Sequence, residues 1–198
     1  MKDQKDLEFD VADWIHNFLD LPNGKLDGFK PCPYSGVAKW RAELGSEPLR
    51  DLVKLALAWD DKLDVVVLGY DPAKLDPHSF EVDIEQANLR ILIPIDLLAL
   101  EDHPQSPEYV NGVSMNIGNW AIVLVQRFSK IRSASRSLKK LGYYQSWSQD
   151  YYNRVVGWRE SYEHAGIQPI GGYLDDRAKY SDLDLSSNNY PSRTQNRE

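Results

Sequence analysis

The sequence predicts an α+β fold in which helices cover a small sheet of three to four strands, followed by a disordered C-terminal tail. Two short apolar runs, residues 64–69 and 120–125, have the length and β-branched content of buried strands. Segments with apolar residues at helical spacing lie around them. Strands that alternate with helices favour a layer of helices on a sheet.

The helices are predicted from their periodicity and their end signals. Pro33 and Pro77 suit the first position of a helix, and Ser46 suits an N-cap. The turn Pro22-Asn23-Gly24 ends the first helix. We expect helices over residues 7–19, 33–45, 46–59, 77–91, 129–141 and 148–164.

The strands are expected at residues 64–69, 96–100 and 120–125, and one more strand is expected within residues 109–116. The run at 120–125 has the strongest strand signal. The run at 96–100 is rich in Leu and Ala, which also favour a helix.

The length of 198 residues fits one domain. We expect a single globular domain over residues 1–170. Residues 171–198 are polar and rich in Ser, Asn and Arg, so we expect them to form a flexible tail.

The composition narrows the functional classes. The net charge of −7 disfavours binding to nucleic acid or to an anionic membrane. A single cysteine, no apolar signal segment and no long apolar run favour a soluble, cytoplasmic protein. No phosphate-binding loop, dinucleotide fingerprint or zinc motif occurs, so the cofactor is unknown and no metal site is predicted.

Cys32 is the first candidate for chemistry. If a helix begins at Pro33, Cys32 occupies its N-cap, where free N–H groups and the helix dipole favour a thiolate. Tyr34 follows closely and could donate a hydrogen bond. The alternatives are a buried, inert cysteine and a redox switch that forms an intermolecular disulfide.

His103 is the second candidate, because it follows Glu101 and Asp102 at the end of a predicted strand. Ligands often bind at the carboxyl ends of strands. Asp102 could orient the imidazole ring and raise its basicity. The alternative is a solvent-exposed acidic turn without function.

A basic stretch is the third candidate. From Arg127 to Lys140 the chain carries six cations and no acid. Arg127 ends the best strand and could bind an anionic substrate beside His103, together with Lys130 and the aromatic wall of Trp120. The same stretch could instead bind an acidic partner protein, or could simply be a solvated helix face.

The order of several short motifs resembles an uncharacterised group of bacterial proteins. The matching positions are Trp14, Cys32-Pro33-Tyr34, Val65 to Leu68, His103-Pro104 and Arg127. The resemblance implies that Cys32, His103 and Arg127 belong together, and it implies no activity. Residues 32–35 are also similar to a glutaredoxin active-site tetrapeptide, but a loop precedes them where a glutaredoxin has a strand, so we treat this similarity as coincidental.

The leading functional hypothesis is a group-transfer or hydrolytic enzyme that acts on a small anionic molecule. Cys32 would be the nucleophile and His103 the general base, oriented by Asp102. The alternative is a non-catalytic adaptor that binds an acidic partner through residues 127–140. Both hypotheses leave the oligomeric state open.

Overall fold

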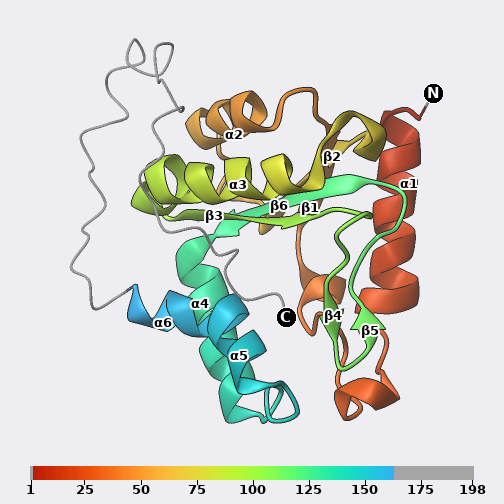
Figure 1. The fold of residues 1–198 in the computed structure, drawn as a ribbon, viewed down its shortest axis with the longest axis vertical. Helices are drawn as coiled ribbons and strands as arrows, with labels where there is room; N and C mark the ends of the chain where they lie inside the picture. The colour runs from red at the N-terminus through yellow and green to blue at the C-terminus, as the bar shows by residue number, and fades with distance from the viewer. Residues whose placement is uncertain (1, 163–198) are drawn as a thin grey trace.

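A four-stranded mixed sheet lies at the centre of the computed structural model, which describes residues 2–162 (Figure 1). The strands lie in the order β1-β2-β6-β3. Their bounds are β1 Trp40–Leu44, β2 Val65–Tyr70, β6 Ala121–Arg127 and β3 Leu97–Asp102. The β1 and β2 strands are parallel, whereas β6 runs antiparallel to both β2 and β3.

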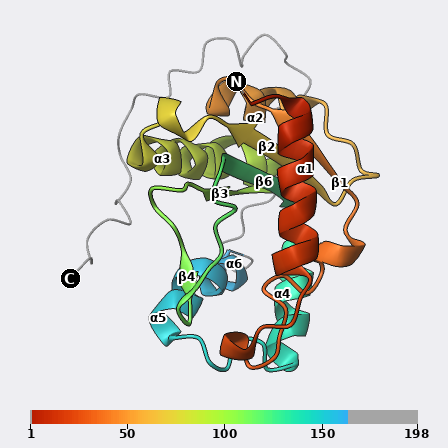
Figure 2. The ribbon, with the colours of Figure 1, turned by 90° about the vertical axis from the view of Figure 1, so that its right-hand side faces the viewer.

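Helices cover both faces of the sheet (Figures 1 and 2). The α2 (Pro48–Leu57) and α3 (Pro77–Ala87) helices pack on one face. The α1 helix (Gln4–Trp14) packs on the other. Both α1 and α3 continue into a π-helical turn, over Ile15–Leu19 and Asn88–Leu92 respectively.

The C-terminal part of the described chain forms a second helical layer below the sheet (Figure 1). The α4 helix (Phe128–Lys140) follows β6 directly. The short α5 (Gln149–Tyr152) and α6 (Trp158–Ser161) helices are joined by the π-helical turn Asn153–Gly157. A separate hairpin pairs β4 (Tyr109–Val110) with β5 (Val113–Ser114).

Both faces of the central strands are buried. In β2, Val66 and Leu68 pack under α2 and α3, whereas Val67 packs under α1. In β6, Val123 lies on the face that α2 and α3 cover, and Ile122 lies on the face that α1 covers. This double burial explains why the two strands are continuous apolar runs in the sequence.

Gly69 allows α1 to approach the sheet closely. A Cβ atom at this position of β2 would overlap the side chain of Leu7 from α1. Leu7 is fully buried, so it has little room to move away. The glycine is therefore required by helix–sheet packing.

The predicted α+β class is confirmed, and so are the predicted strands at 64–69, 96–100 and 120–125. The predicted helix at 33–45 is wrong, because this segment contains a three-residue 3₁₀ turn (Ser35–Val37) and then β1. The side chain of Ala42 is buried between the more exposed Arg41 and Glu43, the alternation of a strand with one buried face.

The strand expected within residues 109–116 occurs as the β4–β5 hairpin, outside the main sheet. The fourth strand of the main sheet is instead β1. The predicted tail, residues 171–198, and the end of the predicted helix at 148–164 lie outside the described residues, and the domain boundary at residue 170 stays a prediction. No helix within residues 2–162 has the length and apolar character needed to cross a membrane.

Candidate functional site

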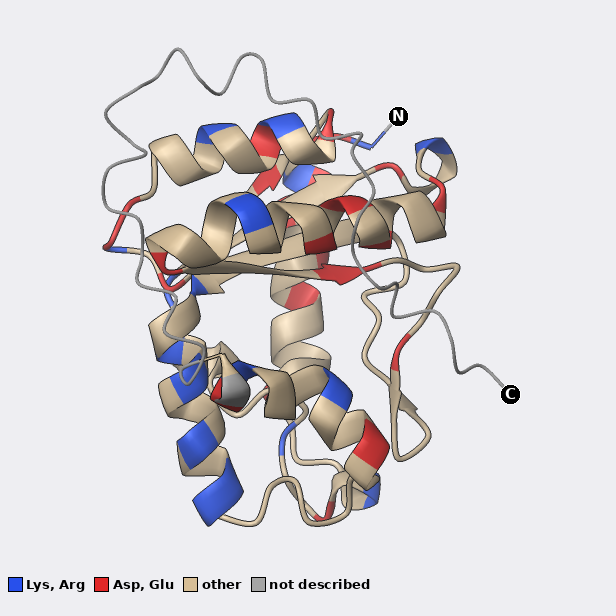
Figure 3. Ribbon diagram, turned by 60° about the vertical axis from the view of Figure 1, so that its left-hand side comes forward, with Lys and Arg blue, Asp and Glu red and all other residues tan. Residues whose placement is uncertain are grey.

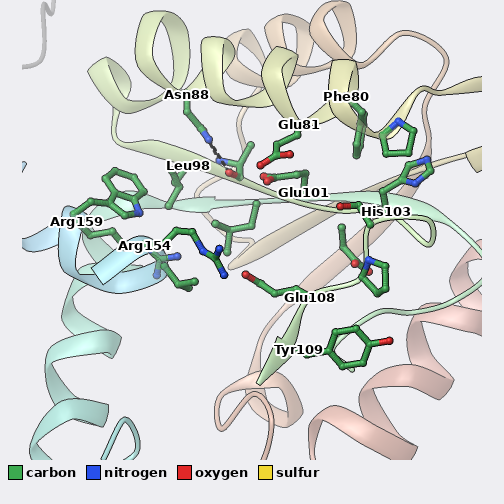
Figure 4. Close-up of a pocket in the computed structure, with 18 residues that line it drawn as sticks. Phe80, Glu81, Asn88, Leu98, Glu101, His103, Glu108, Tyr109, Arg154 and Arg159 are labelled. Carbon is green, nitrogen blue, oxygen red and sulfur yellow. Dashed lines mark hydrogen bonds between the residues drawn. The ribbon is translucent and has the colours of Figure 1, made fainter. Parts of the chain in front are cut away.

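A cavity of about 500 Å³ lies at the end of β3, between α3 and the C-terminal helical layer (Figure 4). The upper wall comes from α3 and β3, and the opposite wall from the turn that joins α5 to α6 and from the segment before β4. Volumes of this size are typical of sites for small molecules. The charged or titratable side chains in the lining are Glu81, Glu101, Asp102, His103, Glu108, Tyr109, Arg154 and Arg159.

His103 is the most deeply buried polar residue of this lining, with 3% of its surface exposed. Its ring packs against Phe80 of α3, with 6.0 Å between the ring centroids. The Nδ1 atom accepts a hydrogen bond from the backbone N–H of Gln105 at 3.2 Å. A neutral ring therefore carries its proton on Nε2. Within residues 2–162, this buried Nε2 atom has no hydrogen-bond partner, and such an atom requires an acceptor.

Two glutamates extend into one side of the cavity from neighbouring elements, Glu81 from α3 and Glu101 from β3 (Figure 4). Both are half-buried. Glu81 makes no hydrogen bond or ion pair with any other residue that the structure describes. Glu81 therefore contributes a negative charge to this side of the cavity.

Glu108 and Arg154 point toward one another on the opposite side (Figure 4). The Glu108 carboxyl group is shielded, although the residue as a whole is exposed, and this shielding raises its pKa. The Tyr151 hydroxyl donates a hydrogen bond to the Glu108 carboxylate, and Arg154 carries a positive charge nearby. Both lower the pKa of Glu108, but less than the shielding raises it. A raised pKa makes the carboxylate a stronger base than a fully solvated one, which is a property that a general base needs.

Cys32 is not part of this cavity. Its residue packs against the apolar cluster beneath α1, which includes Leu19 and Trp40. The expectation of a helix N-cap was wrong, because residues 33–34 form a turn and no long helix follows. Burial raises the pKa of the Cys32 thiol, with a smaller contribution of the same sign from Asp20. The thiolate is thus disfavoured, which is the reverse of what a nucleophile needs.

Asp102 lines the cavity but does not orient His103. Its carboxylate accepts hydrogen bonds from Asn116 Nδ2 at 2.7 Å and from the backbone N–H of Ile117 at 3.2 Å. Successive side chains of a strand point to opposite faces, so adjacent residues at the end of β3 diverge. Burial raises the pKa of Asp102. Its role in the structure is to anchor the loop before β6.

Arg127 lies at the other end of the sheet from His103. Leu97 pairs with Arg127, and Asp102 pairs with Ile122, so five strand residues, about 17 Å, separate Arg127 from the end of β3. Arg127 and His103 each follow the end of a strand, but β3 and β6 are antiparallel, so the two residues lie at opposite ends of the sheet and not beside one pocket.

Arg127 and Lys130 each bind an aspartate of this chain. Arg127 donates hydrogen bonds to Asp61 from Nε at 2.9 Å and from Nη2, and to the backbone carbonyl of Ile95. The Arg127 contact lowers the pKa of Asp61. Lys130 Nζ lies 2.7 Å from Asp64 Oδ1 and lowers the pKa of that carboxyl group.

Trp120 and Tyr34 are also absent from the lining of the cavity. Trp120 is 2% exposed and belongs to the core beneath α1, where its Nε1–H donates to Asp10 Oδ2 at 2.8 Å. Tyr34 is exposed on the turn that follows Cys32. The structure therefore does not bring Cys32, His103 and Arg127 together.

The basic stretch forms a row of cations along α4 (Figure 3). Acids of the same chain balance part of this charge. Besides the two pairs above, Lys139 Nζ lies 3.2 Å from Glu160 Oε2 and over the ring of Tyr152. The binding of an acidic partner to this helix stays a prediction.

Glu81, Glu108 and Arg154 were not predicted as site residues. They come from three separate segments of the chain, and none belongs to a recognisable motif. The sequence signal nearest to the site was His103 at the end of a strand. Its companions could be found only from the packing of α3 and α5–α6 around that strand end.

Within residues 2–162, no three His, Cys, Asp or Glu side chains are grouped so that they could hold a metal ion. Comparisons with protein-family models, with curated proteins and with solved structures give no match. The resemblance to the uncharacterised bacterial group therefore stays a prediction, and a functional assignment depends on the cavity itself.

Proposed function

We propose that this protein binds a small polar molecule in the cavity around His103 and acts on it by acid–base chemistry. One observation carries the proposal: His103 is almost fully buried, lines the cavity and has a ring nitrogen without a partner among the described residues. A buried donor without a partner costs about 1–3 kcal/mol, and a ligand oxygen would remove this cost.

The proposed activity is hydrolysis or group transfer without a cysteine nucleophile. In a hydrolysis, the Glu108 carboxylate would accept a proton from the attacking water, whose oxygen forms the new bond to the electrophilic atom of the substrate. The bond from that atom to the leaving group would then break, and the protonated Glu108 would return its proton to the leaving group. The Nε2–H of His103 would bind the oxygen on which negative charge develops. The raised pKa of Glu108 supports its role as the base.

The test is a thermal-shift screen of small polar molecules with a His103→Phe variant. Phenylalanine retains a ring against Phe80 but cannot donate a hydrogen bond. A molecule that raises the Tm of the wild-type protein should raise it far less in the variant, because stabilisation follows the affinity for the folded state.

The matched control is His78→Phe, the same substitution at an exposed position in the first turn of α3. This control should keep the full ligand-induced shift, and circular dichroism should show that both variants fold. An equal shift in the wild-type protein and in His103→Phe, for every molecule that binds, would overturn the proposal.

A further inference from the structure

A second cleft, of about 300 Å³, lies between the C-terminal half of α1 and the segment that joins β5 to β6. Its lining has no residue in common with that of the cavity around His103. The polar side chains of the lining come from both walls, and they are Asp10, Asp13, Asn17, Ser114, Asn116 and Asn119. The cleft is therefore a separate site, and it does not depend on the proposed function.

The two walls of this cleft are held together at both ends. At one end, Trp120 Nε1 donates a hydrogen bond to Asp10 Oδ2 at 2.8 Å. At the other end, Phe18 packs against the apolar cluster that contains Val113. From Asp10 to Phe18 the helical wall extends over about 12 Å. The packing of α1 on the sheet therefore fixes the position of this wall.

The cleft is unfavourable for an anion. Its lining holds two carboxylates and, within residues 2–162, no cation. Asp10 and Asp13 are neighbours on one face of α1, so their Cβ atoms lie about 5–6 Å apart. Each aspartate uses one oxygen in a hydrogen bond within the chain and keeps the other as an acceptor. Lys2 lies nearby, but its Nζ donates to the Asn119 carbonyl at 2.6 Å and pairs with neither aspartate.

Hydrogen-bond donors lie in the same lining as these acceptors. The Nε1 atom of Trp14 is buried and has no hydrogen-bond partner within residues 2–162. An indole N–H can only donate, so it requires an acceptor. The Ser114 hydroxyl accepts from the Asn116 N–H at 3.4 Å, which leaves its own proton available to donate. A ligand of this cleft must therefore both donate and accept hydrogen bonds.

We infer that this cleft binds a neutral molecule with several hydroxyl groups on an apolar ring, such as a monosaccharide. A hydroxyl group can donate to a carboxylate and can accept from an indole N–H, so one ligand meets both requirements. The rings of Trp14 and Phe18 offer contact area to the C–H groups of a sugar. A simple cation would leave the indole N–H without an acceptor, and two carboxylates repel an anion.

Glucose, galactose and mannose are the neutral probes, and the corresponding uronates and calcium chloride are the charged ones. At least one neutral sugar at millimolar concentration should shift the indole N–H signal of Trp14 in proton–nitrogen NMR spectra. The Trp14→Phe variant identifies this signal by its loss. The uronate of that sugar should bind about tenfold more weakly, because its carboxylate faces Asp10 and Asp13.

Two variants remove one requirement each. Asp13→Asn removes a charge that strengthens a hydrogen bond, and Trp14→Phe keeps a ring but lacks the N–H donor; each should weaken sugar binding by about tenfold. The matched controls are Glu8→Gln, at an exposed position of α1, and Trp59→Phe, in the core on the other face of the sheet. Both controls lie outside the lining and should bind the sugar as the wild-type protein does. Circular dichroism should show that all four variants fold.

No shift of the Trp14 signal with any of the three sugars, equal affinity for a sugar and its uronate, or no effect of Asp13→Asn would each overturn the inference. A response to calcium chloride without a response to any sugar would show a cation site instead. The His103→Phe variant should bind the sugar as the wild-type protein does. Loss of sugar binding in His103→Phe would place the sugar in the other cavity and would also overturn the inference.

Discussion

The side-chain amide of Asn88 exchanges two hydrogen bonds with the backbone of Ala99. Asn88 Nδ2 donates to the Ala99 carbonyl at 2.8 Å, and the Ala99 N–H donates to Asn88 Oδ1 at 2.7 Å. Because β3 is an edge strand, the amide occupies the positions that a further strand would use. The pair also fixes β3 beside α3, at the wall of the cavity.

A side-chain amide makes a similar pair of hydrogen bonds with the backbone of β1, at the opposite edge of the sheet. Gln4 of α1 donates to the Ala42 carbonyl at 2.7 Å and accepts from the Leu44 N–H at 2.9 Å. Both edges of the main sheet are thus closed by an amide side chain that imitates a neighbouring strand. Edge strands without such cover are sites of unwanted pairing between molecules.

Replacement of Asn88 by Ala should destabilise the protein by about 1–3 kcal/mol, because the N–H and C=O of Ala99 lose their partners in a part-buried position. Urea unfolding measures this change. Asn17→Ala is the control, since Asn17 is exposed and its side chain bonds, among the described residues, only to Asp13. This variant should cost less than about 0.5 kcal/mol. Equal costs for the two variants would contradict the edge role of Asn88.

Replacement of Gly69 by Ala should destabilise the protein by about 1–3 kcal/mol, because the new methyl group overlaps Leu7 in a close-packed interface. The midpoint of thermal or chemical unfolding reports the change. Gly24→Ala is the matched control, because a Cβ atom at Gly24 would have no neighbour within 4 Å. A Gly69→Ala variant as stable as Gly24→Ala would show that α1 does not pack as closely as described.

Cys32 should react slowly with thiol reagents. Burial raises its pKa above the ordinary value of 9.0, so the thiolate fraction at neutral pH falls below that of a cysteine in a short peptide. Alkylation by iodoacetamide at pH 7, followed by mass spectrometry, measures the rate, and the unfolded protein in urea supplies the control. Alkylation of the folded protein faster than of the unfolded one would restore Cys32 as a candidate nucleophile.

The Glu108→Gln variant should alter the pH dependence of stability in one direction. Folding raises the pKa of Glu108 above 4.5, so the folded state holds its proton more tightly than the unfolded state. This contribution is fully present below the unfolded pKa and is lost as the pH rises through the folded pKa. The variant should therefore gain stability relative to the wild type between acidic and neutral pH.

Urea unfolding of both proteins at several pH values in this range gives the difference directly. Asp83 also has a raised pKa and remains in both proteins, so its effect cancels. A stability difference between the two proteins that does not change with pH would contradict the shielding of the Glu108 carboxyl group.

Local patterns in the sequence were sufficient to predict most of the elements. The segments that form β2 and β6 are continuous apolar runs because both faces of the sheet are buried at these strands. The apolar residues of α4 recur at the spacing of a helix. The strand β1 was missed because Val37, Trp40 and Leu44 also fit a helical spacing. Only the pairing of this segment with β2 decides that it forms a strand and not a helix.

Local patterns in the chain were enough to assign the α+β class and to mark His103, at the end of a strand, as a candidate. Which residues share its cavity depends on the tertiary packing, because the antiparallel pairing of β3 with β6 sends Arg127 to the far end of the sheet. The packing of distant segments also placed Cys32 among apolar side chains and brought Glu81, Glu108 and Arg154 into the lining of the same cavity as His103. Strand direction and helix packing depend on contacts between distant segments, which no local pattern encodes.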